Sequence, residues 1–224
     1  MLYAKWMLTG LSLAILCVGC AKDPSKDVAK AQVQETPAAN ASSAIESASK
    51  GGLVVQPLTP MPLTGTISFT GSKVTGSYTC LFTRSGGSLG MLGQDITKAS
   101  FNFQAETRDL NCNPDNRTKW TAKLEEHLRS EDFFWSSKHP TASFQSTAIE
   151  ASRATANDLY DVTGQLTLRG VTKQIQFPAT IVLGKRSVEG HAKFSINRKD
   201  FGIEYAGKAD DLIRDNVVLE VSLK

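Results

Sequence analysis

The chain has 224 residues, 41% of them hydrophobic, and this length allows one or two domains. Its formal net charge is +3, and its basic residues form no block. A nucleic-acid-binding surface needs clustered cations to neutralise phosphates, so the composition excludes nucleic acid as an expected partner.

The amino terminus has the pattern of a targeting segment. Lys5 supplies a positive charge, and residues 6–18 form an apolar stretch too short to span a bilayer comfortably. Small residues then precede Cys20, an arrangement that resembles a lipoprotein signal peptide cleaved before the cysteine. We predict a signal peptide over residues 1–19 and acylation of the Cys20 thiol with palmitate-type chains, which would anchor the protein stably.

Two details of this signal bear on the expected location. Ala21, rather than Asp, follows the cysteine, which resembles lipoproteins sent to the outer membrane of Gram-negative bacteria. We therefore expect a lipid-anchored protein on the periplasmic face of that membrane. Cys17 stands where Leu is usual, so an ordinary secretory signal or an uncleaved anchor is the alternative.

The next part of the chain is predicted to be a tether. Residues 21–52 are rich in Ala, Ser, Lys, Glu and Gln and contain no aromatic residue. Such a segment buries too little apolar surface to offset the entropy lost on ordering. We predict a lipidated, disordered tether over residues 20–57 and a single domain over residues 58–224.

The domain is predicted to consist mainly of strands. From Thr64 onward, apolar residues alternate with polar ones, most clearly over residues 99–106. One helical insertion, at about residues 117–136, interrupts this pattern, because Trp120 and the leucines four and eight positions later share a helical face. Asp115 or the next residue, Asn116, is the expected N-cap of that helix.

Eight or nine long strands favour an all-β, eight-stranded antiparallel barrel, because closure removes unpaired edges. Alternation alone does not tell which face of the strands is inside. An outer-membrane barrel would turn its apolar face to lipid. The expected lipid anchor, the helical insertion and the lack of aromatic girdles favour instead a water-soluble barrel with an apolar lumen.

Three motifs carry a resemblance to a known family. The first joins His-Leu-Arg-Ser-x-Asp-Phe-Phe, from His127, to Lys-His-Pro-x-Ala-x-Phe-x-Ser, which ends at Ser146. The second is Gly-Gln-Leu-Thr-Leu-Arg-Gly-Val-Thr-Lys, ending at Lys173, and the third is Arg-Lys-Asp-Phe-Gly-Ile, ending at Ile203. In this order they are similar to the YceI-like family of bacterial envelope proteins. The resemblance implies a lipocalin-like barrel that binds a long polyisoprenoid, such as a quinone or a related isoprenoid chain.

The lumen is the main site hypothesis. Small residues at many inward positions would leave space for a ligand, whereas the alternative is that phenyl rings from opposite strands fill those gaps. The small inward residues are Gly76, Ala99, Ala105, Ala142, Ala148, Gly164, Ala179, Gly190 and Ala192. The wall expected to bind the ligand consists of Phe82, Phe101, Phe103, Phe144, Leu166, Leu168, Phe177, Ile181 and Phe194.

No catalytic motif is present in the sequence. A nucleophile elbow, a His-Glu-x-x-His zinc motif, a paired Cys-x-x-Cys and a phosphate-binding loop are all missing, so we expect neither an enzyme nor a cofactor apart from a bound lipid. His127, His139 and Asp132 would suit a two-His-one-carboxylate metal site. We favour a structural role for them and predict no metal.

The helical insertion also supplies candidates for the mouth of the barrel, where a polar head group would lie. The alternative for the charged candidates is that they form salt bridges within the turn. The same two alternatives, a head-group contact or a salt bridge, apply to Arg198 and Asp200. The candidate head-group residues are Arg129, Asp132, Phe133, Phe134 and His139.

Cys80 and Cys112 remain after the signal, in a compartment where a disulfide persists. A hairpin that turns through residues 94–95 would place Cys80 opposite Asp109, three residues short of Cys112. That offset is roughly 10 Å along a strand, beyond the reach of a disulfide, although extra residues on the second strand would shorten it. We predict proximity and leave the bond open.

These observations predict an envelope lipoprotein that binds or carries an isoprenoid or a similar long-chain lipid. The alternative, from a different class, is a structural or interaction module of the stressed cell envelope that binds no ligand. The sequence predicts no oligomeric state.

Overall fold

The structure is a computed structural model that describes residues 21–34, 60–91, 93–152, 158–184 and 187–224. Within these ranges the chain forms a 13-stranded sheet and a separate two-stranded hairpin. The main path of the sheet has the order β3-β6-β7-β9-β10-β11-β12-β15-β4-β5-β8. Its strands are β3 (Met61–Leu63), β4 (Gly65–Lys73), β5 (Gly76–Phe82), β6 (Ser85–Gly90), β7 (Ser100–Glu106), β8 (Leu110–Cys112), β9 (Thr141–Ala151), β10 (Leu159–Leu168), β11 (Val171–Leu183), β12 (Val188–Asn197) and β15 (Asn216–Leu223).

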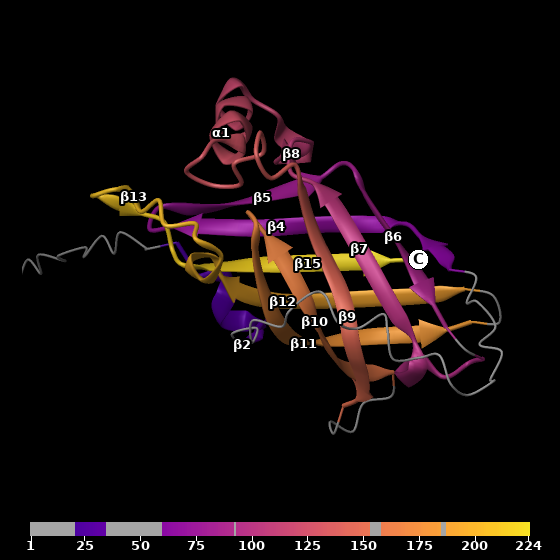
Figure 1. The fold of residues 1–224 in the computed structure, drawn as a ribbon. Coiled ribbons are helices and arrows are strands. Elements are labelled where there is room, and N and C mark those ends of the chain that lie inside the picture. The colour runs from indigo at the N-terminus through magenta and orange to yellow at the C-terminus, as the bar shows by residue number, and fades with distance from the viewer. Residues whose placement is uncertain (1–20, 35–59, 92, 153–157, 185–186) are drawn as a thin grey trace, which may run out of the picture.

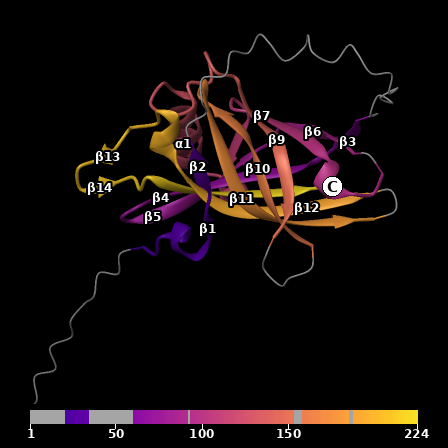
Figure 2. The same cartoon turned by 60° about the horizontal axis from the view of Figure 1, so that its bottom comes forward.

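The sheet closes into a barrel, because several of these strands continue one another. Thr64 alone separates β3 from β4, two residues separate β5 from β6, and three separate β7 from β8. The path therefore consists of eight long strands interrupted by short breaks, and β15 pairs with β4 to complete the circle (Figure 1; Figure 2). The predicted antiparallel barrel with one helical insertion is confirmed.

The two ends of the barrel carry different elements. The Val74–Thr75 turn between β4 and β5, the helix α1 (Lys119–Arg129) and the 3-10 turn η4 (Arg198–Phe201) lie at what we call the α1 end. A hairpin of β13 (Gly207–Lys208) and β14 (Asp211–Leu212) projects from this end (Figure 1). The C-terminus and the connection from β6 to β7 lie at the opposite end.

Thr118 caps α1, and the predicted caps Asp115 and Asn116 are wrong. The Thr118 side chain accepts a hydrogen bond from the Thr121 amide, and the Thr121 hydroxyl accepts one from the Thr118 amide. Asp115 and Asn116 instead belong to a separate 3-10 turn, η3 (Pro114–Asn116), which delays the start of the helix. The capping box therefore satisfies two first-turn amides that would otherwise lack partners.

The buried face of α1 also differs from the expected one. Thr121, Glu125 and Leu128 are buried, whereas Trp120 is 46% exposed. Glu125 accepts a hydrogen bond from the Cys112 amide at 3.0 Å, which draws this face toward β8. Leu128 and Leu124 of the predicted stripe still pack on the core, and the polar contact of Glu125 adds to them.

The segment expected to be a disordered tether is ordered over residues 21–34. It contains η1 (Pro24–Asp27), β1 (Ala29–Lys30) and β2 (Gln32–Gln34). β11 and β12 pair only where Thr180–Leu183 meets Val188–His191, and the segment lies between them beyond that point. There β1 pairs in parallel with β12 and β2 pairs antiparallel with β11.

These unpaired strand edges explain why the tether prediction is wrong for this segment. The edges offer backbone hydrogen bonds that composition does not reveal, such as the bond from the Ala31 amide to the Ser195 carbonyl at 2.8 Å. Ala31 itself is buried in the core. The rest of the predicted tether, residues 35–57, lies outside the described residues, as do the predicted signal peptide and Cys20.

Cys80 and Cys112 form a disulfide between β5 and β8. Cys80 pairs with Cys112 itself, so the expected pairing with Asp109 is wrong. The register shifts because Thr107 leaves the ladder, and its amide and hydroxyl donate to the backbone carbonyls of Pro140 and His139. The extra residues lie on the second strand, which is the change that brings the cysteines together.

Candidate binding site in the barrel lumen

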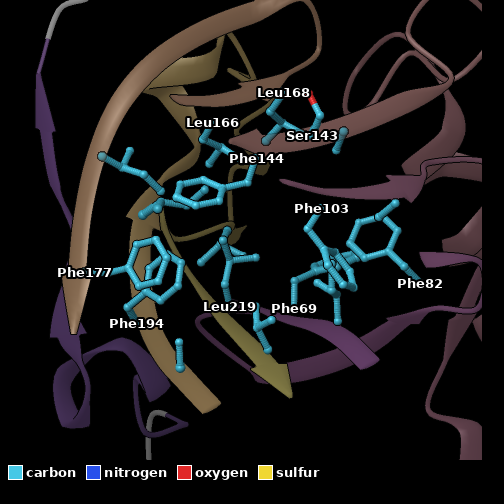
Figure 3. A pocket seen from close by; sticks show the side chains of 18 of the residues that line it. Phe69, Phe82, Phe103, Ser143, Phe144, Leu166, Leu168, Phe177, Phe194 and Leu219 are labelled. Carbon is cyan, nitrogen blue, oxygen red and sulfur yellow. The ribbon is translucent and has the colours of Figure 1, made fainter. Parts of the chain in front are cut away.

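The barrel encloses a cavity of about 220 Å³. Alternation along the strands turns apolar side chains into it, as in β7, where Phe103 and Ala105 are buried and Gln104 and Glu106 are exposed. All nine predicted wall residues line the cavity: Phe82, Phe101, Phe103, Phe144, Leu166, Leu168, Phe177, Ile181 and Phe194. Figure 3 labels all of them except Phe101 and Ile181. Whether they bind a ligand stays a prediction.

The phenyl rings stand in two groups on opposite sides of the lumen. Phe177 stacks on Phe194 at 4.1 Å between ring centroids, and Phe144 lies 5.4 Å from Phe177. On the other side Phe69 and Phe82 lie 5.3 Å apart (Figure 3). The rings pack within each group and leave space between the groups, which favours a hollow lumen over a filled core.

Small residues contribute to this space, although fewer than predicted. Ala148 faces the outer surface, because the pairing of β9 with β10 shifts by one residue at Thr163 and Gly164. Gly164 instead gives room to the Phe144 ring, since a Cβ there would lie 2.4 Å from its Cζ. The predicted small residues that line the cavity are Ala105, Ala142, Ala179, Gly190 and Ala192.

Two phenylalanines from the turn after α1 close the α1 end of the lumen. Phe134 is buried and packs edge-on against Phe69 and Phe82, with centroids 5.4 and 5.7 Å away. Phe133 lines the cavity and also packs against Tyr205, at 5.5 Å. Both residues were predicted at a mouth for a polar head group; they lie at the α1 end of the lumen, and contact with a head group stays a prediction.

The other three candidate head-group residues do not line the cavity. The Arg129 Nε donates to the Arg108 carbonyl at 2.7 Å, and Asp132 lies 2.8 Å from the His127 ring nitrogen. His139 packs against Gly170 and lies 5.7 Å from the Trp135 ring. These side chains hold the turn in place, which agrees with the structural alternative.

Arg198 is a buried cation at the α1 end, 4% exposed. Its guanidinium donates to the carbonyls of Ile203, Arg214 and Ile213 and to the Asp215 carboxylate. Burial lowers the pKa of Arg198, while Asp215 acts to raise it. Although Arg198 touches the cavity, its donors are committed to the backbone of residues 203–215, so it fastens the loop that closes this end.

The wall contains apolar residues that the sequence reasoning did not assign to it. The alternation within their strands was the signal that would have identified them. They are Ile67, Phe69, Leu89, Ile175, Ile196 and Leu219.

Two features are absent from the described part of the chain. It holds no group of three or more His, Cys, Asp or Glu residues arranged to bind a metal ion. It also holds no helix that is both long enough and apolar enough to cross a membrane.

Comparison with known proteins places this barrel in context. The model of the YceI-like domain matches residues 60–224. A UPF0312 protein of Azotobacter vinelandii is 40% identical over 91 residues, which make up 37% of this chain and 45% of that protein. A UPF0312 protein of Pseudomonas fluorescens is 32% identical over 123 residues, 51% of this chain and 62% of that protein. The matched parts thus span about half the length of these relatives.

Two solved structures share the fold. BcnA of Burkholderia cenocepacia superposes with a TM-score of 0.60 at 18% identity, covering 71% of this chain and 94% of that chain. A polyisoprenoid binding domain of Saccharophagus degradans, implicated in plant cell wall breakdown, gives 0.57 at 18% identity, covering 74% and 97%. At this identity the likeness concerns the barrel architecture.

Proposed function

The chain belongs to the YceI-like family, and on that basis we propose that it binds a long-chain isoprenoid or a similar lipid in its barrel lumen. The observation that carries the proposal is the enclosed apolar cavity between the two groups of phenyl rings. The structural neighbour from Saccharophagus degradans, named as a polyisoprenoid binding domain, supports this class of ligand.

The wall chemistry favours an apolar chain over a polar metabolite. Of the described residues that line the cavity, only Ser143, His191 and Arg198 are polar, and Arg198 is occupied by backbone carbonyls. A polar ligand would lose its hydration here without gaining partners. Each buried methylene of an apolar chain instead contributes about 0.8 kcal/mol. We therefore assign a binding role rather than a catalytic one.

We further propose that the protein is a lipoprotein of the cell envelope, acylated at Cys20 and held on the periplasmic face of the outer membrane. The small residues before Cys20 and the apolar stretch over residues 6–18 support this part of the proposal. Its test is the substitution Cys20→Ser, which is expected to abolish acylation and to release the protein into the soluble fraction. Continued membrane fractionation of the variant would contradict acylation at this site.

Lipid extraction tests the lumen itself. The protein is purified from the cells that make it, extracted with organic solvent, and the extract is analysed by mass spectrometry. We expect an isoprenoid or similar long-chain lipid that is depleted in extracts of the Ala105→Phe variant. If the folded protein and this variant yield the same bulk phospholipids only, lumen binding is wrong and a structural module of the envelope becomes the better account.

A further inference from the structure

Exposed large apolar side chains gather at one end of the barrel. Among the described residues, four such side chains are exposed: Val74 at 38%, Trp120 at 46%, Val182 at 45% and Leu212 at 49%. Val74, Trp120 and Leu212 belong to elements of the α1 end, whereas Val182 lies near the end of β11, at the opposite end. Single exposed apolar residues are common, but a group at one end indicates an interaction surface.

The β4–β5 turn, which contains Val74, lies against the β13–β14 hairpin, which contains Leu212, 138 positions later in the sequence. Lys73 forms an antiparallel bridge with Ile213, and the Arg214 amide donates to the Ser72 carbonyl at 2.9 Å. The Thr75 amide also donates to the Asp211 carboxylate at 3.1 Å. These contacts bring the turn of Val74 and the hairpin of Leu212 to the same part of the α1 end.

Trp120 lies on α1, at the same end of the barrel. Its ring lies over Tyr78 with centroids 4.4 Å apart, and Tyr78 is two residues into β5 from the turn. Trp and Tyr are enriched at membrane interfaces, because one part of each ring system is apolar and the other is polar.

The chain enters the described structure on this surface. The Ala21 amide donates to the Val74 carbonyl at 3.2 Å, and Arg214 donates to the Ala21 carbonyl at 3.0 Å. Cys20, the proposed acylation site, directly precedes Ala21 in the sequence. An anchor at that position brings a bilayer to the α1 end.

Three lysines at this end are paired with carboxylates. Lys22 pairs with Asp27 at 2.8 Å, and Lys199 pairs with Asp215 at 2.9 Å. Lys73 pairs with Asp211. Attraction to anionic head groups is therefore expected to be weak, and contact with a bilayer would depend on apolar side chains rather than on salt concentration.

We propose that the α1 end is a membrane-docking face, on which Val74, Leu212 and Trp120 contact the lipid surface. The inference rests on the proposed anchoring of the N-terminus and adds an orientation to it. The end of the lumen that Phe133 and Phe134 close then faces the bilayer.

Fluorescent labels at two matched positions test this orientation. Leu212→Cys and Val182→Cys replace side chains of similar exposure at opposite ends. The cysteines of the domain are joined in a disulfide and Cys20 would carry the anchor, so an environment-sensitive dye attaches at the new thiol. The acylated protein is reconstituted into vesicles of phosphatidylethanolamine and phosphatidylglycerol that contain a lipid-borne quencher.

The docking face predicts a blue shift and quenching for the dye at position 212 and neither for the dye at position 182, at both low and high salt. Equal responses at the two positions, or none at position 212 in protein that floats with the vesicles, overturn the orientation while leaving anchoring intact. Protein that carries no acyl group and does not float overturns both docking and anchoring. Whichever of these results is obtained, the lipid-extraction experiment tests lumen binding independently.

Discussion

The rings of Phe177 and Phe194 stack with their centroids 4.1 Å apart. In this part of the barrel their strands, β11 and β12, no longer pair with each other. The N-terminal segment pairs with both strands there, and Ala31 packs into the same core cluster as the two rings. This segment precedes the part of the chain that the family model matches. It therefore adds to the barrel and its core from outside the recognised domain.

Ala31→Glu tests whether the segment is needed by the barrel. A carboxylate at this position would be buried without a partner, so we expect the free energy of unfolding to fall by about 3 kcal/mol. Ala29→Glu is the matched control, because Ala29 is exposed on the same segment. Urea denaturation measures the free energy of unfolding of both variants. Equal values would show that the segment does not pack as described.

Ala105→Phe tests the lumen by filling it. The added ring points into the cavity beside Phe103, so we expect loss of lipid binding at a cost in stability of about 1–3 kcal/mol from overpacking. Phe103→Trp is expected to act in the same direction. Gln104→Phe adds the same ring on the outer face of β7 and serves as the control. Undiminished isoprenoid binding by folded Ala105→Phe and Phe103→Trp proteins would rule out this cavity as the binding site.

Local alternation accounts for what the sequence predicted well. It indicates which residues of a strand share a face, and all nine predicted wall residues do line the cavity. Alternation does not reveal the register between paired strands, which changes wherever one of the two strands contains extra residues. Ala148 and the Cys80 partner were therefore misplaced by a one-residue shift in β9 and by the departure of Thr107 from its ladder.

The other errors come from contacts between distant parts of the chain. The composition of residues 21–34 suggests disorder, but their stability depends on strand edges that β11 and β12 leave open more than 130 positions later. On α1 the sequence reasoning wrongly buried Trp120 and missed Glu125, a charged residue that is buried with its bond to Cys112. Neither contact has a local signature in the sequence.

Glu125→Ala tests that buried contact. Glu125 is 2% exposed, accepts from the Cys112 amide at 3.0 Å and pairs with Arg117 through both carboxylate oxygens at 2.9 and 2.8 Å. Removing the carboxylate leaves the buried amide without an acceptor, so we expect a loss of about 1–3 kcal/mol in the free energy of unfolding. Glu126→Ala, at the exposed neighbour, is expected to change it by less than about 0.5 kcal/mol. A Glu125→Ala protein as stable as the Glu126→Ala control would show that the contact does not hold α1 on β8.

Asp211 links the projecting hairpin to the β4–β5 turn and makes this link sensitive to acid. The hydrogen bond from Lys73 is the main cause that lowers the pKa of Asp211 below its ordinary value of 3.8, and bonds from the Thr75 hydroxyl and amide lower it further. Because folding lowers this pKa, the link contributes its full stability above pH 3.8 and loses it as the pH falls through the lower value of the folded state.

A carboxyl-carbon NMR titration is expected to show an Asp211 midpoint below 3.8, with the Thr75 amide resonance shifting over the same pH range. Lys73→Met removes the main cause of the low pKa and should move the midpoint back toward 3.8, whereas Lys98→Met, at the opposite end of the barrel, should leave it in place. An unchanged midpoint in the Lys73→Met protein would mean that Lys73 does not hold the hairpin against the turn. The turn of Val74 and the hairpin of Leu212 would then no longer be held together, which would also weaken the case for the docking face.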